Sequence, residues 1–489
     1  MPGSKSPTVT AALPRRRTSL PLLALGVTAA DLLLVYGFLG QRFYPLNPVW
    51  VYLMLYAIAF GVYVYAAGRV VPALRKGNAR AALPLILGGA ALYRLAVVFA
   101  PPHLSTDIFL YIWDGRLINH GINPYHWAPN ATPLRYLRDG VWNEAEYKSY
   151  QSIYMPVSQM VFALANALFG TNSVGYKFLY MLFDFGVIGL LLVVLKRLNR
   201  PLTQVIWYAW CPLPVTEVSL AGHQDIVGVF FLLAAFALAM RPKEQGQGKE
   251  QGQGKEQNRG WKYGGGVALL LAASVLTKGF ALLLLPLFTR VHGRAFAVWA
   301  ACGLLYLGMP LWVYLPQFLH GMHQYLENIH VNSGLFGWVN LGLSYITRHW
   351  HYVITENLSD AALLGVTYWS VRRPVADYAD LLRRAFVVLA VTLLVIPTLF
   401  PWYLLWTIVF VPLLGRKPLY SFVLLSGLSA LLYVYYYSMQ AYWWVSAAEY
   451  GPFYALLAWE FWRARHARDD VQHSGRAGDG RAALGGAYL

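Results

Sequence analysis

Long apolar runs recur along the whole chain, and each is close to the length that a helix needs to cross a lipid bilayer. The first extends from about Leu20 to Leu39, and similar runs follow near 49–67, 81–100, 176–195 and 203–221. A shorter span is expected near 402–414. A spanning helix requires about 20 predominantly apolar residues. Only 12% of the 489 residues are charged and 57% are hydrophobic, whereas soluble domains carry about 25% charged residues. The sequence therefore predicts an all-α polytopic membrane protein.

The basic residues indicate how these runs are oriented. The formal net charge is +17, and the basic residues form short clusters between the apolar runs. These clusters are Arg15–Arg17, Arg69–Arg80, Lys196–Arg200, Arg241–Lys262, Arg290–Arg294, Arg372–Arg384, Arg416–Lys417 and Arg463–Arg468. Such clusters mark cytoplasmic loops in membrane proteins. The charge therefore predicts orientation, with both termini cytoplasmic, and it argues against a nucleic-acid partner.

The alternation of loops predicts three regions. Residues 1–80 hold a cytoplasmic tail and two transmembrane helices, 81–463 form one membrane domain, and 464–489 form a disordered cytoplasmic tail. Within the domain we expect an outer loop at 101–155, an interfacial helix at 156–170 and a second outer loop at 316–355. We also expect a disordered cytoplasmic loop at 241–262, two short helices that turn near Lys278 and Gly279, and about 12–14 transmembrane helices in all. Cys211 and Cys302 lie in apolar runs and imply no disulfide framework.

The segment PPHLSTDIFLYIWDGRLINHGINPY, residues 101–125, concentrates acidic residues beside a membrane span. A carboxylate is costly near a membrane, so it usually serves chemistry or transport. If 106–120 is helical, Asp107, Tyr111 and Asp114 share one face. Asp107 could instead cap this helix, and Asp114 could pair locally with Arg116.

Other polar residues are expected at the outer ends of the spans. Arg94 would either bind an anion or extend its charge to the interface. His223 and Asp225, in LAGHQD, form either part of a site or a polar turn, and they are too few for a metal centre. Lys278 lies within SVLTKGFALLLL, where its ammonium needs either a phosphate or an internal carboxylate.

These segments, taken in order, resemble the GT-C glycosyltransferases, in particular bacterial polyprenol-phosphate-mannose-dependent mannosyltransferases. The resemblance begins with HLSTDIFLYIWDGRLINHGINPY and continues through IYMPVSQMVFAL, PVTEVSLAGHQD, VLTKGFALLLLP, YLENIHVNSGLF, PTLFPWYLLW and EYGPF. It covers about residues 81–463. The sequence departs from the family pattern at Thr106, where relatives carry a first acidic residue, and at Phe400, where they often carry His.

The resemblance implies a GT-C-like bundle that transfers a sugar, with mannose expected, from a polyprenyl phosphate to an acceptor hydroxyl with inversion. Asp107 matches the catalytic base, and the candidates for a second carboxylate are Asp114 and Asp225. The expected ligands of the donor phosphate are Arg94, Arg116, His223 and Lys278. The expected substrate-binding residues are Asn123, Tyr125, Asn332, Trp402, Tyr403, Glu449 and Tyr450. No metal site is expected and no cofactor is required, although a divalent cation stays open.

The expected partners are a polyprenyl-phosphate sugar donor, a glycan or lipid-linked acceptor, and the bilayer itself. The expected location is the inner (plasma) membrane, with the active site on the extracytoplasmic face. Two alternatives stay open. A transporter or lipid flippase would also have many spans, and a lipid-linked oligosaccharide ligase would share the donor chemistry but transfer a longer glycan.

Overall fold

The protein is built from helices. This computed structural model describes residues 20–40, 48–74, 76–102, 104–240, 253–329, 331–414, 419–438 and 443–477, and no strand occurs in these ranges. Four helical segments are long and apolar enough to cross a membrane, namely Leu20–Leu39, Val49–Ala73, Arg80–Val98 and Ser173–Arg197, and seven shorter apolar helices accompany them. The prediction of an all-α polytopic membrane protein is confirmed.

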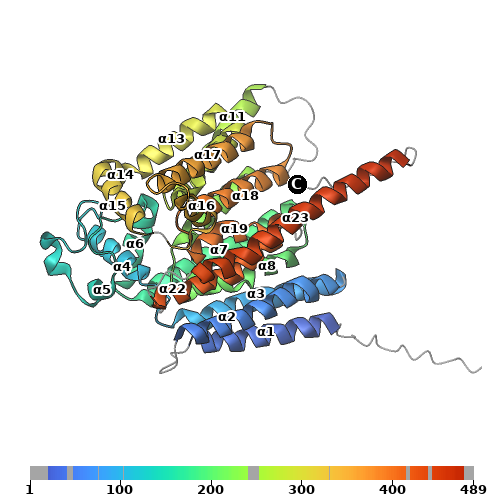
Figure 1. Ribbon diagram of the computed structural model, residues 1–489, viewed down its shortest axis with the longest axis horizontal. Helices are drawn as coiled ribbons and strands as arrows, with labels where there is room; N and C mark the ends of the chain where they lie inside the picture. Colours follow the sequence, from blue (N-terminus) through green and yellow to red (C-terminus); the bar gives the residue numbers. More distant parts are fainter. Residues whose placement is uncertain are drawn as a thin grey trace, which may run out of the picture.

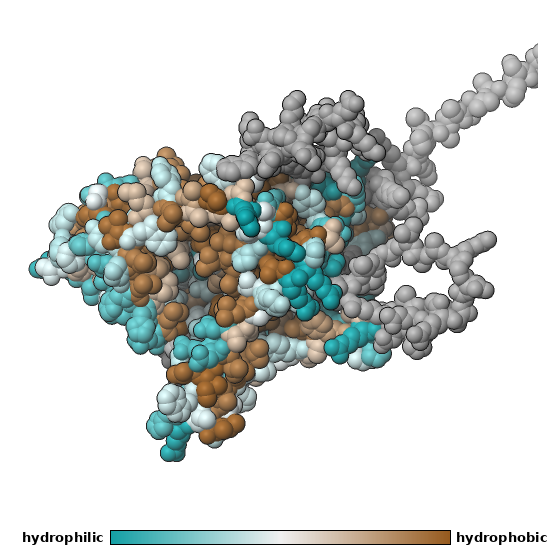
Figure 2. Space-filling view, turned by 90° about the horizontal axis from the view of Figure 1, so that it is seen from above, coloured by the Kyte–Doolittle hydropathy of each residue, from teal (hydrophilic) through white to brown (hydrophobic). Residues whose placement is uncertain are grey.

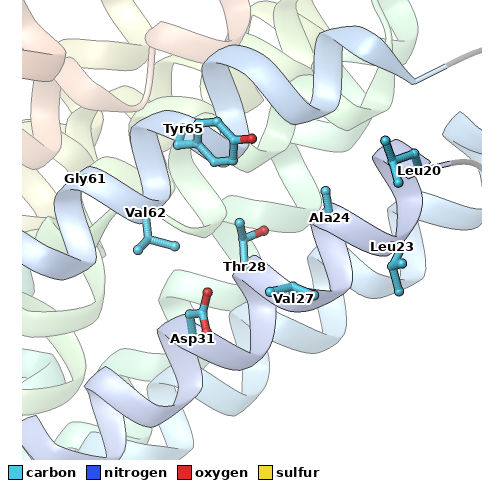
Figure 3. Close-up of a pocket in the computed structure, with 9 residues that line it drawn as sticks. All are labelled: Leu20, Leu23, Ala24, Val27, Thr28, Asp31, Gly61, Val62 and Tyr65. Carbon is cyan, nitrogen blue, oxygen red and sulfur yellow. The ribbon is translucent and has the colours of Figure 1, made fainter.

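The first three helices form an antiparallel group. They are α1 (Leu20–Leu39), α2 (Pro48–Tyr65), which continues through the π turn η1 (Ala66–Val70) and the 3₁₀ turn η2 (Val71–Ala73), and α3 (Lys76–Val98). A groove of about 500 Å³ lies between α1 and α2. Figure 3 shows that Asp31, which is exposed, points from α1 into this groove. The groove is formed by α1 and α2 alone and includes none of the polar residues expected to carry function.

The segment after α3 forms a polar cap at one end of the bundle. It contains α4 (Asp107–Asn119), η3 (Thr132–Leu137), α5 (Gly140–Glu144) and α6 (Pro156–Phe169). Figure 1 shows α4, α5 and α6 at one end, whereas the C-terminal part of α23 (Trp443–Ala477) extends from the other. Gly115 lets α4 approach α6 closely, because a Cβ at this position would lie 2.3 Å from the backbone oxygen of Phe162. Asn119 then bonds the carbonyl of Ala163 and the side chain of Asn166.

A buried ion pair joins α3 to α7 (Ser173–Arg197). Arg94 Nε donates to Asp184 Oδ2 at 2.5 Å, and both side chains are fully buried. The guanidinium also donates to the carbonyls of Ala90 and Ala209, and the Tyr208 hydroxyl donates to Asp184 Oδ1 at 2.7 Å. A buried charge needs such partners, so the two long helices are held in a fixed register.

The predicted continuous spans at 203–221 and 402–414 are broken into short pieces. The first consists of η4 (Leu202–Val205), α8 (Ile206–Ala209), α9 (Pro212–Pro214) and the π-helical η5 (Val215–Leu220), before α10 (Asp225–Ala239). The second consists of η7 (Pro401–Leu404), α19 (Leu405–Ile408) and α20 (Val411–Leu414). Pro212, Pro214, Pro401 and Pro412 lack the N–H group that a continuous helix needs. Almost all of these residues are buried, which is where irregular backbone is tolerated inside a membrane protein.

The helix α11 (Gln253–Val275) is followed by a turn at 276–278 and then by η6 (Gly279–Leu284) and α12 (Leu285–His292). This arrangement agrees with the predicted turn near Lys278 and Gly279. The expectation of a disordered loop over 241–262 is wrong for 253–262, which are helical; Lys, Glu and Gln are good helix formers beside an apolar helix. Residues 241–252 lie outside the described residues.

The C-terminal third completes the bundle, and its helices have the following bounds: α13 (Arg294–Leu307), α14 (Met309–Trp312), α15 (Leu315–Asn328), α16 (Gly334–Ser344), α17 (His351–Val371), α18 (Tyr378–Val395), α21 (Tyr420–Leu428), η8 (Ser429–Leu431), α22 (Leu432–Ser438) and α23. The predicted disordered tail from 464 is wrong up to Ala477, because α23 continues through it. Residues 1–19 and 478–489 lie outside the described residues. Figure 2 shows apolar side chains spread over the outside of the bundle, as expected for surfaces that face lipid.

Candidate active site

Asp107 is the first residue of α4 and lies in a partly buried position near the end of the bundle. The N-cap residue of α4 is Thr106, and the Asp107 backbone N–H donates to Ser105 Oγ at 3.2 Å. Asp107 therefore does not occupy the N-cap position, and the alternative in which it only caps the helix is wrong. One turn later along the same face, the Tyr111 hydroxyl lowers the pKa of the Asp107 carboxyl slightly, which agrees with the predicted shared face.

Three charged side chains surround Asp107. Burial raises the pKa of its carboxyl, the positive charges of His223 and Lys278 lower it, and the negative charge of Asp225 raises it again. The net shift is upward. Asp107 is therefore a stronger base, when ionised, than an ordinary aspartate. These three charges come from two segments of the chain, the turn at 221–225 and the turn at 276–278.

His223 and Asp225 are positioned by the turn between η5 and α10. Gly222 adopts a left-handed conformation with φ +85°, and a Cβ there would also lie 2.7 Å from Ile108 of α4. Only glycine adopts this conformation readily, so the AGHQD sequence reverses the chain directly against α4. Asp225 then begins α10, where the helix N-terminus favours a negative charge.

Lys278 pairs with Asp225 at this turn. Its Nζ donates to Asp225 Oδ1 at 2.8 Å and lies 3.7 Å from the centroid of the Tyr403 ring. Trp406 Nε1 donates to the same carboxylate oxygen at 3.3 Å. Asp225 is almost fully buried, whereas the Lys278 side chain is 22% exposed. The internal carboxylate that we considered for Lys278 is therefore present, and the Lys278 side chain stays partly exposed.

The His223 ring is held on two sides. Its Nδ1 lies 3.0 Å from Glu217 Oε2 and 3.2 Å from the Glu217 carbonyl oxygen. Its face stacks on Trp402, with ring centroids 3.6 Å apart and planes 17° apart. The Tyr433 hydroxyl contacts both Glu217 carboxylate oxygens, at 3.0 and 2.9 Å. Sequence analysis missed Glu217, although an acid inside a predicted span was a signal that could have found it.

Three tyrosines and one further acid also interact electrostatically with Asp107. The charge of Asp107 raises the pKa of Tyr147, Tyr154 and Tyr325, after the larger effect of burial. Tyr147 has φ +51°, a strained conformation for a residue other than glycine. Glu146 was also missed from the sequence, and its pKa is raised by burial and then by the charge of Asp107.

A second group of polar side chains is centred on Asn332. Asn332, with φ +56°, donates to the Leu399 carbonyl at 3.2 Å and to Glu449 Oε1 at 3.1 Å. The Tyr450 hydroxyl donates to the Asn332 carbonyl at 2.9 Å. The structure therefore brings three of the expected substrate-binding residues, Asn332, Glu449 and Tyr450, into one group.

The remaining expected site residues serve internal contacts. Arg94 is fully buried with Asp184, and Arg116 donates to Asp139 Oδ2 and the Leu137 carbonyl. Neither arginine joins the group around Asp107, and Arg116 does not pair with Asp114. These buried or loop-bound guanidinium groups leave Lys278 and His223 as the cations closest to Asp107.

Asp114, Asn123 and Tyr125 make internal hydrogen bonds that hold the outer segment in place. Asp114 Oδ2 accepts from Ser152 Oγ at 2.5 Å and Gln159 Nε2 at 2.8 Å, and burial raises its pKa to about 7. Asn123 donates to the Pro310 carbonyl, and the Tyr125 hydroxyl donates to the Tyr154 carbonyl. Of the two candidates for a second carboxylate, Asp225 is therefore the one whose charge acts on Asp107.

The described part of the chain contains no group of three or more His, Cys, Asp or Glu side chains arranged to hold a metal ion. The candidate site thus consists of two carboxylates (Asp107 and Asp225), two cations (Lys278 and His223) and the aromatic rings of Trp402 and Tyr403. Such a set can accept a proton and neutralise an anionic group beside a membrane.

The fold and this site define a polytopic helical membrane protein with an acid–base centre at one end of its bundle. Residues 23–294, more than half of the chain, match the model of the family described as "Alpha-(1->6)-mannopyranosyltransferase, N-terminal domain". The chain belongs to this family and is a glycosyltransferase of the mannosyltransferase kind, which confirms the resemblance stated above. No curated protein and no solved structure gives a significant match.

Proposed function

We propose that this protein transfers mannose from a polyprenyl-phosphate donor to an acceptor hydroxyl, with Asp107 as the catalytic base. The observation that carries the proposal is the placement of Asp107 among Lys278, His223 and Asp225. The proposal includes the bond type that the family description names, an α-(1→6) linkage. The acceptor would then be the primary 6-hydroxyl of a mannose residue on a glycan or lipid-linked acceptor.

The reaction would be a single displacement. Asp107 removes the proton of the acceptor hydroxyl while its oxygen attacks the anomeric carbon, and the bond to the phosphate oxygen breaks. A base positioned in this way contributes about 10²–10⁴-fold to the rate. The phosphate leaves with the electron pair and needs cations rather than a proton, which Lys278 and His223 would supply. Attack from the side opposite the leaving phosphate inverts the anomeric carbon.

The membrane setting fits a donor with a lipid tail. Lys278 is partly exposed beside the Tyr403 ring, so a phosphate could reach it while its polyprenyl chain stays in the bilayer. We place this site on the extracytoplasmic face of the plasma membrane and both termini in the cytoplasm. The support is the alternation of basic clusters: Arg80 near the start of α3 and Arg197 at the end of α7 lie at the helix ends opposite α4 and α6.

The test is a transfer assay in membranes with radiolabelled polyprenyl-phosphate-mannose. We expect Asp107→Asn to accumulate normally and to transfer at least about 100-fold more slowly than the wild type. Glu144→Gln, which changes an exposed acid of the same outer segment in the same way, should keep full activity. Full activity of Asp107→Asn would remove Asp107 as the base, and movement of the intact labelled lipid without transfer would favour the flippase alternative.

A further inference from the structure

One buried acid has no part in the reaction described above. Glu217 lies in the π-helical segment η5 and is 1% exposed. Its only charged neighbour within ion-pair distance, among the described residues, is the ring of His223. π-helical segments are rare and often occur at functional sites. A buried carboxylate without a function would be expensive to keep.

The contacts of His223 fix which of its ring nitrogens carries a proton. Nδ1 faces the carboxylate and the carbonyl oxygen of Glu217, and neither group can donate. Nδ1 must therefore carry the hydrogen. The other ring nitrogen, Nε2, is buried and finds no hydrogen-bond partner in the part of the chain that the structure describes.

The charge of Glu217 determines what Nε2 can do. A carboxylate in an apolar interior is best compensated by a positive partner, and a protonated imidazole has N–H groups on both nitrogens. The stacked Trp402 ring also favours a cation at 3.6 Å. Glu217 thus favours a form of His223 in which Nδ1–H faces Glu217 and a second hydrogen is carried by Nε2.

We propose that Glu217 is a positioning residue that keeps His223 charged, so that His223 Nε2–H donates a hydrogen bond to the phosphate of the polyprenyl-phosphate donor and product. This inference rests on the proposed function. The hydrogen bond would be charge-assisted, because both the imidazolium and the phosphate are ionised. No proton is consumed: Asp107 takes the proton of the acceptor, and His223 keeps its own.

The experiment measures binding rather than transfer. The probes are a polyprenyl phosphate and the matching polyprenol without phosphate, and the proteins are full-length wild type and Glu217→Gln at pH 6 and pH 8. Gln has the shape of Glu and can still accept from His223 Nδ1–H and from the Tyr433 hydroxyl, so the fold should persist. An ordinary histidine has a pKa of about 6.5, so a charge that the proposal assigns to Glu217 should matter more at pH 8 than at pH 6.

We expect Glu217→Gln to bind the polyprenyl phosphate like the wild type at pH 6 and on the order of tenfold more weakly at pH 8. Binding of the polyprenol should not change at either pH. His223→Gln should weaken phosphate binding at both pH values. Glu460→Gln makes the same change at a buried acid of α23 that accepts from Tyr420 and Ser421 of α21, and it should behave like the wild type.

Equal weakening at both pH values would mean that Glu217 is merely structural and would overturn this inference, as would unchanged binding at pH 8. Both outcomes leave the proposed function standing, provided that the wild type still binds the polyprenyl phosphate and transfers mannose. A wild type that neither binds polyprenyl phosphate nor transfers mannose would overturn the proposed function itself.

Discussion

At the scale of single residues, the candidate site combines acids with different roles. Asp107 is partly exposed and faces cations, whereas Asp114, two turns further along α4, is buried and accepts two hydrogen bonds from neutral groups. Burial without a cation raises the pKa of Asp114 to about 7. The two aspartates of α4 therefore lie in different environments. That of Asp107 suits the proposed chemistry, whereas Asp114 makes structural hydrogen bonds.

The raised pKa of Asp114 predicts a stability that depends on pH. Between about pH 4 and pH 7 the folded state holds a proton on Asp114 that the unfolded chain has released, so stability falls as the pH rises through this range. Asp114→Asn cannot ionise and should escape this fall. Its melting temperature, relative to the wild type, should rise by roughly 1–3 °C between pH 5 and pH 8 in detergent.

The matched variant for that measurement is Glu144→Gln, which changes an exposed acid and should show the same difference from the wild type at both pH values. A constant difference for Asp114→Asn would show that Asp114 does not hold its proton in the folded protein.

At the scale of elements, the contact between α4 and α6 depends on the absence of a side chain. A Cβ at Gly115 would lie 2.3 Å from the oxygen and 2.6 Å from the carbon of the Phe162 carbonyl, and backbone atoms cannot move aside as a side chain does. Because α4 carries Asp107 and α6 packs against α4, this contact also sets the position of Asp107, the proposed base.

We expect Gly115→Ala to destabilise the protein by about 1–3 kcal/mol through overpacking and to lower transfer activity by shifting α4. Gly189→Ala in α7 is the matched control, because no atom lies within 4 Å of the added Cβ; alanine there should be neutral or slightly stabilising. Thermal unfolding and transfer assays check both variants, and a Gly115→Ala protein as stable as Gly189→Ala would show that the close approach is absent.

The helices could be predicted from sequence wherever apolar composition alone decides them. The runs at 20–39, 81–100 and 176–195 agree with α1, α3 and α7, and the predicted interfacial segment agrees in extent with α6. The breaks at 202–220 and 401–414 were missed, because a buried segment stays apolar whether or not its helix is continuous. Attention to Pro212 and Pro214 would have indicated the first break.

The site was predictable only in part. Asp107, His223, Asp225 and Lys278 were identified from their positions at span ends, and the structure brings them together. Arg94 could not be assigned from sequence, since its partner Asp184 lies 90 residues away and only packing reveals the pair. Glu217 was missed for the same reason: its partners are set by the chain reversal at Gly222 and by Tyr433, far along the sequence.

At the scale of the whole molecule, the bundle has two unlike ends. The end that holds α4, α5 and α6 carries the candidate site (Figure 1). Arg80 near the start of α3, and Lys196 and Arg197 at the end of α7, lie at the other end. Loops rich in Lys and Arg stay on the cytoplasmic side. The two ends should therefore face different compartments.

Labelling with a membrane-impermeant maleimide tests this orientation in a protein whose Cys211 and Cys302 are first replaced by serine. Glu144→Cys in α5 should react in intact cells, and Lys196→Cys at the end of α7 should react only after the membrane is permeabilised; both positions are exposed. The reverse pattern would place the candidate site in the cytoplasm and contradict the proposed topology.

The contacts that join distant parts of the chain have a consequence for biogenesis. His223 stacks on Trp402, Asp225 accepts from Trp406, and Glu217 accepts from Tyr433. In each pair, the first residue lies in the family-matched region 23–294 and its partner lies after it in the chain. While the ribosome is still translating the last third, the nascent chain already holds the proposed base Asp107, Lys278 and His223, but not the rings that pack against this site. The partly synthesised protein should therefore be inactive in the membrane until its last helices have been inserted.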